Sequence, residues 1–392
     1  MNFLDRYNFT FAQKKILQDI AADFEMWNEP SLESIFPSHL TQKYTHKELA
    51  RQIIKFYESR WNELKKNPKN YQNFENIKYQ NERKISFEPY KKEGLSLGSC
   101  PVASPNTRCC NLLTLDAVES CGFDCSYCSI QSFYNENKIG YDQDFGEKLA
   151  KLKLNPNEIY HIGTGQSSDS LMWGDKFGTL SALVEFAKKN PNVILELKTK
   201  SDNIKFLLEN EIPRNIIVTW SLNTPIIIQN EEHLTASLDE RIASARALAD
   251  KNILVGFHFH PIVVYENYLE DYVDVVNKLL QKFSQKEVAL VSLGTLTFIK
   301  PVINKLRNRG LKSKILQMPF VDANKKSSYS LEQKREMFGA VYSAFKPWHK
   351  DVYFYLCMED ESLWRDVFGY EYASNNQFEE FMKMSYMGKV NG

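Results

Sequence analysis

The chain has 392 residues, of which 43% are hydrophobic and 13% aromatic, and its 49 Lys and Arg residues balance its 49 Asp and Glu residues. This composition is enough for a sizeable core, and the neutral total excludes a protein that coats polyanions through its overall charge. No apolar stretch reaches the roughly 18 residues of a membrane span, and the first residues lack the apolar run of a secretion signal. We therefore expect a cytoplasmic protein without a membrane partner.

Positive charge is concentrated in two segments. Residues 41–93 carry 13 Lys and Arg against 7 Asp and Glu, and residues 300–326 carry 8 against 1. Such segments are compatible with a phosphate-bearing substrate and equally with solvated helix faces.

Residues 1–100 are predicted to form a polar, largely helical extension. Apolar residues recur at helical spacing over 50–61, whereas residues 67–91 are rich in Asn, Lys and Tyr and predict an irregular connector. Three cysteines follow, Cys100, Cys109 and Cys110. We expect them to be small buried hydrophobic residues, with a second thiol site as the alternative.

Cys121, Cys125 and Cys128 then follow in a C-x3-C-x2-C pattern, with Tyr127 directly before the last cysteine. On a helix, the first and last would lie about 10 Å apart along the axis, but in a loop all three can converge on one centre. A 4Fe–4S cluster takes four cysteines, so three leave one iron open to a small molecule. Zinc or redox thiols are the alternatives. A structural zinc site fits poorly, because such sites usually take four ligands in two separated pairs. The pattern resembles the radical S-adenosylmethionine (SAM) superfamily.

After this loop, strands and helices alternate. Strands are predicted over 111–118, 158–162, 193–198, 215–221, 254–258 and 287–292, and helices over 180–189, 204–209, 238–251, 269–283 and 300–308. Six such units predict an α/β fold in which a parallel sheet curls into a partial (β/α)6 barrel of TIM type, with reacting groups at the carboxyl ends of the strands.

We expect three domains: a helical amino-terminal extension over 1–100, the barrel over 101–313, and a carboxyl-terminal α/β extension over 314–392. The last of these should contain a polar loop over 322–330, a helix over 331–345, a strand over 352–358 and a short helix carrying Trp364 and Phe368.

Polar residues follow several of the predicted strands. Gly163, Gly165, Ser168 and Asp169 come after the second strand, and glycine there lets a ligand approach the backbone. Lys198 and Lys200 end the third strand, where an ammonium group can pair with a carboxylate; surface lysines are the alternative. Ser221 ends the fourth strand. His258 and His260 share one face of the fifth, as site residues or as hydrogen-bonded core histidines.

As an ordered set, these motifs resemble the spore photoproduct lyase family of radical SAM proteins. The set comprises the cysteine loop, Gly163-Thr164-Gly165, Ser168-Asp169-Ser170, the segment 195–201, Trp220-Ser221-Leu222-Asn223, Glu231-Glu232-His233, the segment 235–241, and the segment 256–262.

The resemblance implies a 4Fe–4S cluster on Cys121, Cys125 and Cys128, and reductive cleavage of SAM to a 5′-deoxyadenosyl radical. It further implies SAM contacts at Ser168, Asp169, Lys200 and Ser221, an electron donor of flavodoxin or ferredoxin type, and reversion of a methylene-bridged thymine dimer in DNA.

The sequence departs from the family pattern at two positions. Gln166 stands where those lyases carry a hydrogen-donor cysteine, and Ser129 replaces the tyrosine after the last cluster cysteine, whereas Tyr127, expected to be catalytic, is kept. Amide N–H and C–H bonds are too strong to replace a thiol donor. Cys100, Cys109, Cys110 or Cys357 would have to supply the hydrogen instead.

The leading hypothesis is a radical SAM enzyme acting on a DNA or nucleotide lesion. The alternatives are radical SAM chemistry on another small molecule or peptide, and a non-catalytic Fe–S or zinc module that binds nucleic acid. The sequence assigns neither the substrate nor an oligomeric state.

Overall fold

The computed structural model describes residues 6–67, 69–72, 74, 85–100, 106–128, 137–323 and 325–392. Its centre is an eight-stranded sheet in the order β16-β12-β11-β9-β8-β7-β3-β2. In chain order, the strands are β2 (Leu97–Ser99), β3 (Leu113–Leu115), β7 (Tyr160–Thr164), β8 (Val193–Thr199), β9 (Ile216–Ser221), β11 (Leu254–Ile262), β12 (Val288–Thr295) and β16 (Tyr353–Leu356). Neighbouring strands run parallel except for β2 and β3.

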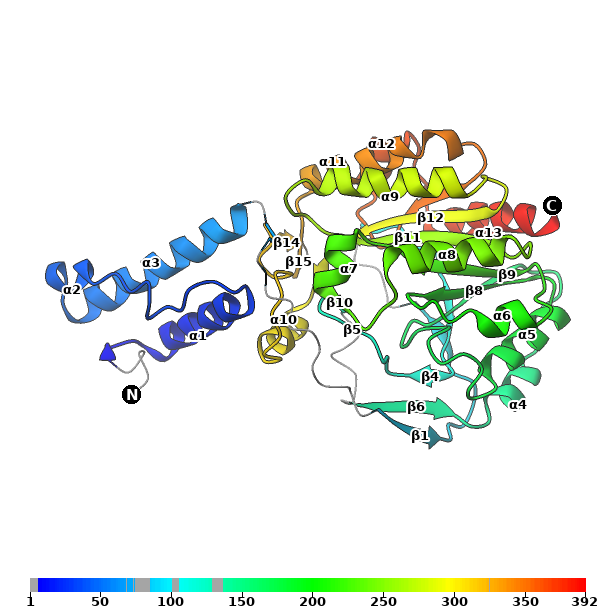
Figure 1. Ribbon diagram of the computed structural model, residues 1–392, viewed down its shortest axis with the longest axis horizontal. Helices are drawn as coiled ribbons and strands as arrows, with labels where there is room; N and C mark the ends of the chain where they lie inside the picture. Colours follow the sequence, from blue (N-terminus) through cyan, green and yellow to red (C-terminus); the bar gives the residue numbers. More distant parts are fainter. Residues whose placement is uncertain are drawn as a thin grey trace.

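Helices cover one face of this curved sheet (Figure 1). They are α5 (Thr179–Lys189), α6 (Lys205–Glu209), α8 (Leu238–Ala249) and α9 (Tyr268–Lys282). The central strands are buried on both faces, which is why they read as nearly continuous apolar runs. The predicted partial barrel is confirmed.

One predicted βα unit is wrong. Helix α10 (Lys300–Arg307) follows β12 but packs against α1 (Phe11–Met26) and not on the sheet. The helix that packs on α9 and β12 is α11 (Leu331–Ala344), and the chain then adds β16 to the sheet. The periodicity of α10 shows an apolar stripe but does not say which surface that stripe contacts.

Several short elements were not predicted. The expected connector contains β1 (Ser86–Tyr90), which pairs with β6 (Lys138–Asp142), and β6 pairs in turn with β4 (Val118–Glu119). The expected polar loop contains β14 (Val321–Ala323) and β15 (Lys326–Ser328), which join β13 (Thr297–Phe298). The long loop after β9 contains α7 (Pro225–Glu231) and β10 (Glu232–His233), and β10 pairs with β5 (Asp124–Cys125). Such short strands are set by tertiary pairing, because two or three residues carry no period.

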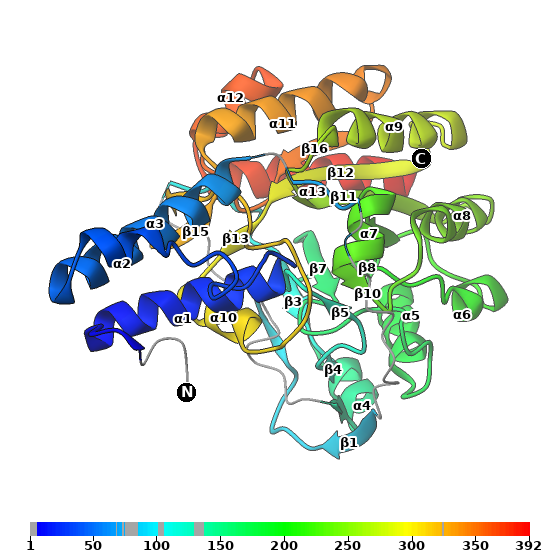
Figure 2. The same cartoon turned by 60° about the vertical axis from the view of Figure 1, so that its left-hand side comes forward.

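The amino-terminal helices are α1, α2 (His39–Lys43) and α3 (His46–Lys66), with α3 burying the predicted apolar face. They form a separate layer beside α10 and the β13–β15 hairpins (Figures 1 and 2). Asp23 of α1 is buried and accepts hydrogen bonds from Trp61 Nε1 at 2.9 Å and from Arg307 Nε at 2.7 Å. The extension is therefore fixed to the connection between β12 and β16.

The carboxyl-terminal part closes the sheet from the other side. Helix α13 (Asn375–Asn391) contacts β8, β12 and β16, and its Tyr386 ring meets the His161 ring edge-on at 5.3 Å between centroids. The remaining helical elements are α4 (Phe145–Ala150), the 3₁₀ turn η3 (Lys346–Trp348) and α12 (Ser362–Phe368). Among the described residues, none of the helices has the length and apolar character to cross a membrane.

Candidate functional site

A cavity of about 1190 Å³ opens at the carboxyl ends of the parallel strands. All the residues predicted to bind the cluster or SAM line it together with Tyr127: Cys121, Cys125, Cys128, Ser168, Asp169, Lys200 and Ser221. Residues up to 100 positions apart in the sequence are thus brought to one chamber, as expected for side chains that follow neighbouring parallel strands.

The cysteine loop is held by the Glu231-Glu232-His233 segment. Strand β10 pairs antiparallel with β5, which places Glu232 opposite Cys125 and His233 opposite Asp124. The Ser126 amide donates to the Glu231 carbonyl at 2.8 Å, and the hydroxyls of Ser126 and Tyr127 bond to the carboxylates of Glu231 and Glu232. Sequence reasoning placed this segment in the family pattern but missed its role, because nothing in its spacing identifies its partner.

The buried Glu231 carboxylate joins four segments. Besides Ser126, it accepts hydrogen bonds from the Tyr71 hydroxyl at 2.9 Å, the Ser313 hydroxyl at 2.6 Å and the Lys314 amide at 2.9 Å. Burial raises the pKa of Glu231, and these donors oppose that rise. The Glu231 carboxyl group therefore connects the amino-terminal part of the chain, the cysteine loop and the segment after α10.

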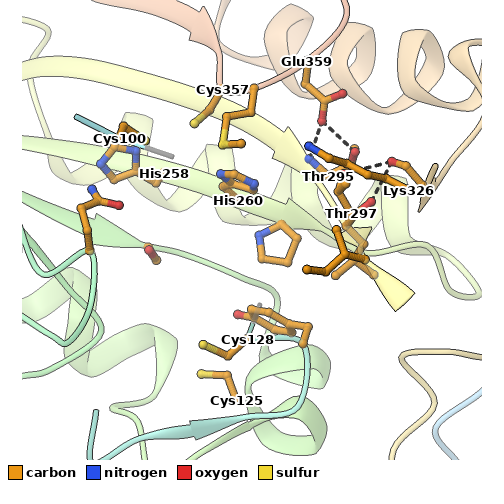
Figure 3. A pocket seen from close by; sticks show the side chains of 18 of the residues that line it. Cys100, Cys125, Cys128, His258, His260, Thr295, Thr297, Lys326, Cys357 and Glu359 are labelled. Carbon is orange, nitrogen blue, oxygen red and sulfur yellow. Dashed lines mark hydrogen bonds between the residues drawn. The ribbon is translucent and has the colours of Figure 1, made fainter. Parts of the chain in front are cut away.

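The three cysteines face the cavity from one side. In Figure 3 the sulfur atoms of Cys125 and Cys128 lie next to each other and point into the chamber. Burial raises the pKa of Cys121 and of Cys125, with the nearby Cys128 thiol adding to both, while Lys200 lowers that of Cys125. Thiolates here need neighbouring positive charge, and converging thiols are the donor set of Fe–S iron. The three cysteines therefore supply the residue type that such a cluster needs.

Cluster ligation nevertheless remains a prediction. Within the described part of the chain, no group of three or more His, Cys, Asp or Glu residues is arranged so that it could hold a metal ion.

A buried ionic group lies next to the cysteines. Arg241 and Glu232 form an ion pair at 2.6 Å, both almost fully buried, and Arg241 also donates to the Ser221 carbonyl at 2.8 Å. The Lys200 ammonium lies 5.6 Å from the centre of the Tyr127 ring. Burial would lower the pKa of Lys200, but Cys125 and Glu232 raise it overall, so this lysine stays cationic.

Ser168 and Asp169 play different parts in the loop after β7. Asp169 accepts hydrogen bonds from the Thr199 hydroxyl and the Lys200 amide, both at 2.7 Å, and from two amides of its own loop. Its carboxylate therefore fixes this loop to the end of β8. The buried Ser168 hydroxyl, in contrast, has no hydrogen-bond partner among the described residues, which leaves it available to a ligand. Gly165, at φ +82°, is required because a Cβ would lie 2.8 Å from the Lys198 carbonyl.

Deeper in the barrel than the loop after β7 lies a buried polar network centred on Glu196. Its two carboxylate oxygens bond to His161 Nε2 and His258 Nε2, each at 2.8 Å, and Ser292 bonds to His258 Nδ1 at 2.6 Å. Burial alone would raise the pKa of Glu196, but the two histidines hold it well below its usual value. His258 is thus a hydrogen-bonded core histidine that also borders the cavity, as His260 does.

The model of the family described as spore photoproduct lyase matches residues 117–330, more than half of the chain. The chain belongs to the spore photoproduct lyase family. This confirms the resemblance drawn from the ordered motifs, and the match includes the cysteine loop and the loops after β7, β8, β9 and β11.

Individual relatives are distant. The spore photoproduct lyase of Clostridium acetobutylicum is 26% identical over 179 residues, which cover 44% of this chain and 53% of that relative. The chain thus spans about half of the length of the curated relatives it matches.

Among solved structures, a spore photoproduct lyase complexed with dinucleoside spore photoproduct matches with a TM-score of 0.59 at 18% identity, over 69% of this chain and 82% of that one. A mutant of such a lyase with bound AdoMet and the same dinucleoside gives 0.58 at 19% identity, with the same coverage. These structures share the fold with this chain.

Proposed function

We propose that this protein is a radical SAM enzyme that binds a 4Fe–4S cluster through Cys121, Cys125 and Cys128. The observation that supports this proposal most directly is that these thiols line one cavity together with Lys200 and Ser168, whose hydroxyl has no hydrogen-bond partner in the described structure. The bound cluster would supply an electron that cleaves SAM to a 5′-deoxyadenosyl radical, with a flavodoxin- or ferredoxin-type protein as its electron source.

The chain's own residues would orient SAM. The Lys200 ammonium is suited to pair with the SAM carboxylate, and the Ser168 hydroxyl can bond to a polar group of the ligand. Asp169 fixes the amide of Lys200 and so sets the position of that side chain. Ser221 lines the same wall, with its carbonyl held by Arg241.

Tyr127 is proposed as a catalytic residue of this site. Its buried hydroxyl donates to the Glu232 carboxylate, next to Cys125 and Cys128. A carboxylate partner can accept the phenol proton if the ring is oxidised, so this pair can hold a proton beside the cluster loop.

We propose a nucleic-acid lesion as the substrate, because relatives bind dinucleoside spore photoproduct. The cavity mouth carries Lys305, Arg309 and Lys326, from the basic segment found in the sequence. Arg309 is paired with Asp124 of the cysteine loop, whereas Lys326 has no acidic partner among the described residues. Cationic groups at the mouth fit the phosphates that flank a lesion.

A second candidate is radical SAM chemistry on a different small molecule. The observation that favours it is Gln166, which lines the cavity and carries no thiol.

The two candidates are separated by incubating the reconstituted protein with SAM, dithionite and dinucleoside spore photoproduct under anaerobic conditions. The proposal predicts conversion of the dinucleoside and formation of 5′-deoxyadenosine. Formation of 5′-deoxyadenosine that the dinucleoside neither stimulates nor consumes would favour the second candidate.

A further inference from the structure

Four thiols gather on the cavity wall opposite the cysteine loop. Cys100, Cys110 and Cys357 line the cavity, and Cys109, which precedes Cys110 in the chain, is not among the lining residues. Figure 3 shows Cys100 and Cys357 across the chamber from Cys125 and Cys128, with His260 between the two groups. All four are free thiols.

Long-range contacts bring these thiols together. The segment that contains Cys109 is tied to the carboxyl-terminal part through the Cys109 amide, which donates to Asn375 Oδ1 at 3.1 Å, and through Arg108, which pairs with Glu361 at 2.7 Å. The Cys357 amide donates to the Leu293 carbonyl of β12 at 2.8 Å. All four thiols belong to segments that lie outside the family match at 117–330.

The strand register gives the height of Cys357 in the barrel. Ser221, His258, Ser292 and Tyr355 stand opposite one another across β9, β11, β12 and β16 and form one layer. Cys357 comes two residues after Tyr355, and so it lies one layer nearer the mouth, as His260 does relative to His258. Cys100 pairs its amide with the Leu112 carbonyl, before the start of β3, and lies deeper.

The protonation state of each cysteine further limits which of them can donate a hydrogen atom. A hydrogen bond from Cys110 lowers the pKa of Cys109, which favours the Cys109 thiolate, and the Cys110 proton is engaged with that neighbour. Burial raises the pKa of Cys100, and it raises that of Cys357 to about 12, so both keep their S–H bonds. An S–H bond is weak enough to give a hydrogen atom to a carbon radical, whereas a thiolate has none to give.

We propose that Cys357 is the hydrogen-atom donor to the substrate radical in this protein. This inference rests on the proposed function. In the step, the Cys357 S–H bond breaks, a C–H bond forms on the product, and a thiyl radical remains on Cys357. One electron from the ferredoxin- or flavodoxin-type donor and one proton then restore the thiol.

Solvent deuterium tests this step. In D2O, with SAM, dithionite and dinucleoside spore photoproduct, the wild type should place one deuterium in the product. Cys357→Ala and the size-matched Cys357→Ser should still form 5′-deoxyadenosine. Their product should lack that deuterium, and its yield should fall at least about tenfold. Cys109→Ala is the control and should keep both, since Cys109 does not line the cavity. Unchanged deuterium in both Cys357 variants would overturn the inference.

A second readout does not need the cluster. The dinucleoside should protect Cys357 of the iron-free chain from methyl methanethiosulfonate, as measured by peptide mass spectrometry; equal labelling with and without it would contradict the assignment. Formation of 5′-deoxyadenosine without product by the wild type would also overturn it. Absence of 5′-deoxyadenosine would instead overturn the proposed function.

Discussion

At the scale of single residues, the site separates ligand-binding groups from groups that hold the protein together. Asp169 and Ser168 are neighbours in one loop, yet the Asp169 carboxylate bonds to Thr199 and Lys200, whereas the Ser168 hydroxyl has no partner within the described part of the chain. The sequence shows both as polar residues at a strand end, and only the hydrogen bonds tell them apart.

Ser168→Ala should therefore weaken SAM binding without destabilising the fold. We expect a loss of about fivefold in SAM affinity, equivalent to one hydrogen bond of roughly 1 kcal/mol, measured by calorimetry on the reconstituted protein. The matched control is Ser170→Ala, whose hydroxyl bonds to Thr164 at 2.7 Å. That variant should lose stability rather than affinity, and the reverse result would contradict these roles.

The two histidines of β11, His258 and His260, should make the free energy of unfolding fall in acid. Burial lowers the pKa of His258 to about 4 and that of His260 to about 3, so the unfolded chain takes up protons below about pH 6.5 while the folded chain does not. Glu196 adds a loss at still lower pH, because its depressed pKa stabilises the fold only while it is ionised. The free energy of unfolding should drop by on the order of 6 kcal/mol between pH 7 and pH 4, about 3 kcal/mol from each histidine.

Urea denaturation of the iron-free chain across this range measures the drop. His258→Gln should be less stable at neutral pH but should show a shallower decline toward pH 4. Parallel profiles for wild type and variant would show that His258 does not contribute to the acid response.

At the scale of elements, the amino-terminal helices are joined to the barrel by buried polar contacts. Asp23 and Arg307 connect α1 to α10, and Tyr71 reaches Glu231 beside the cysteine loop. Residues 6–74 lie outside the family match at 117–330, so these contacts join a segment outside the match to Glu231 and Arg307 inside it.

Asp23→Ala should destabilise the protein strongly, because it removes the buried partner of the mostly buried Arg307 and leaves it only the more exposed Asp19, at 3.2 Å. We expect a cost of about 3 kcal/mol in the free energy of unfolding, together with faster proteolysis after α3. The control is Glu33→Ala, which breaks an exposed pair with Arg6 at 3.0 Å and should cost less than about 1 kcal/mol. Similar midpoints for both variants would rule out Asp23 as an anchor.

Tyr71→Phe should alter the cysteine loop from a distance. It removes a donor to Glu231, which also holds Ser126, so the electron paramagnetic resonance signal of the reduced cluster should shift and SAM cleavage should slow about threefold or more. Tyr265→Phe is the control, since its hydroxyl reaches Thr224 and Asp271 instead. An unchanged spectrum in Tyr71→Phe would show that the extension does not influence the loop.

At the scale of the whole molecule, the barrel and its chamber could be predicted from the sequence, because parallel strands put their carboxyl ends together and the motifs lie at those ends. The surroundings of the chamber could not be predicted, because they depend on contacts between distant segments. These contacts pack α10 on its partner, bind Glu231 and Glu232 to the cysteine loop, and bring Cys357 close to Cys100 and Cys110. Neither spacing nor periodicity carries that information.

The whole account depends on the cysteine loop carrying a reactive cluster. The most direct test is to reconstitute the protein with iron and sulfide under anaerobic conditions, add dithionite and SAM, and measure 5′-deoxyadenosine, with Cys125→Ala in parallel. The account predicts 5′-deoxyadenosine from the wild type and none from the variant. A wild-type protein that holds a full, reducible 4Fe–4S cluster and yet yields no 5′-deoxyadenosine, with or without dinucleoside spore photoproduct, would contradict it.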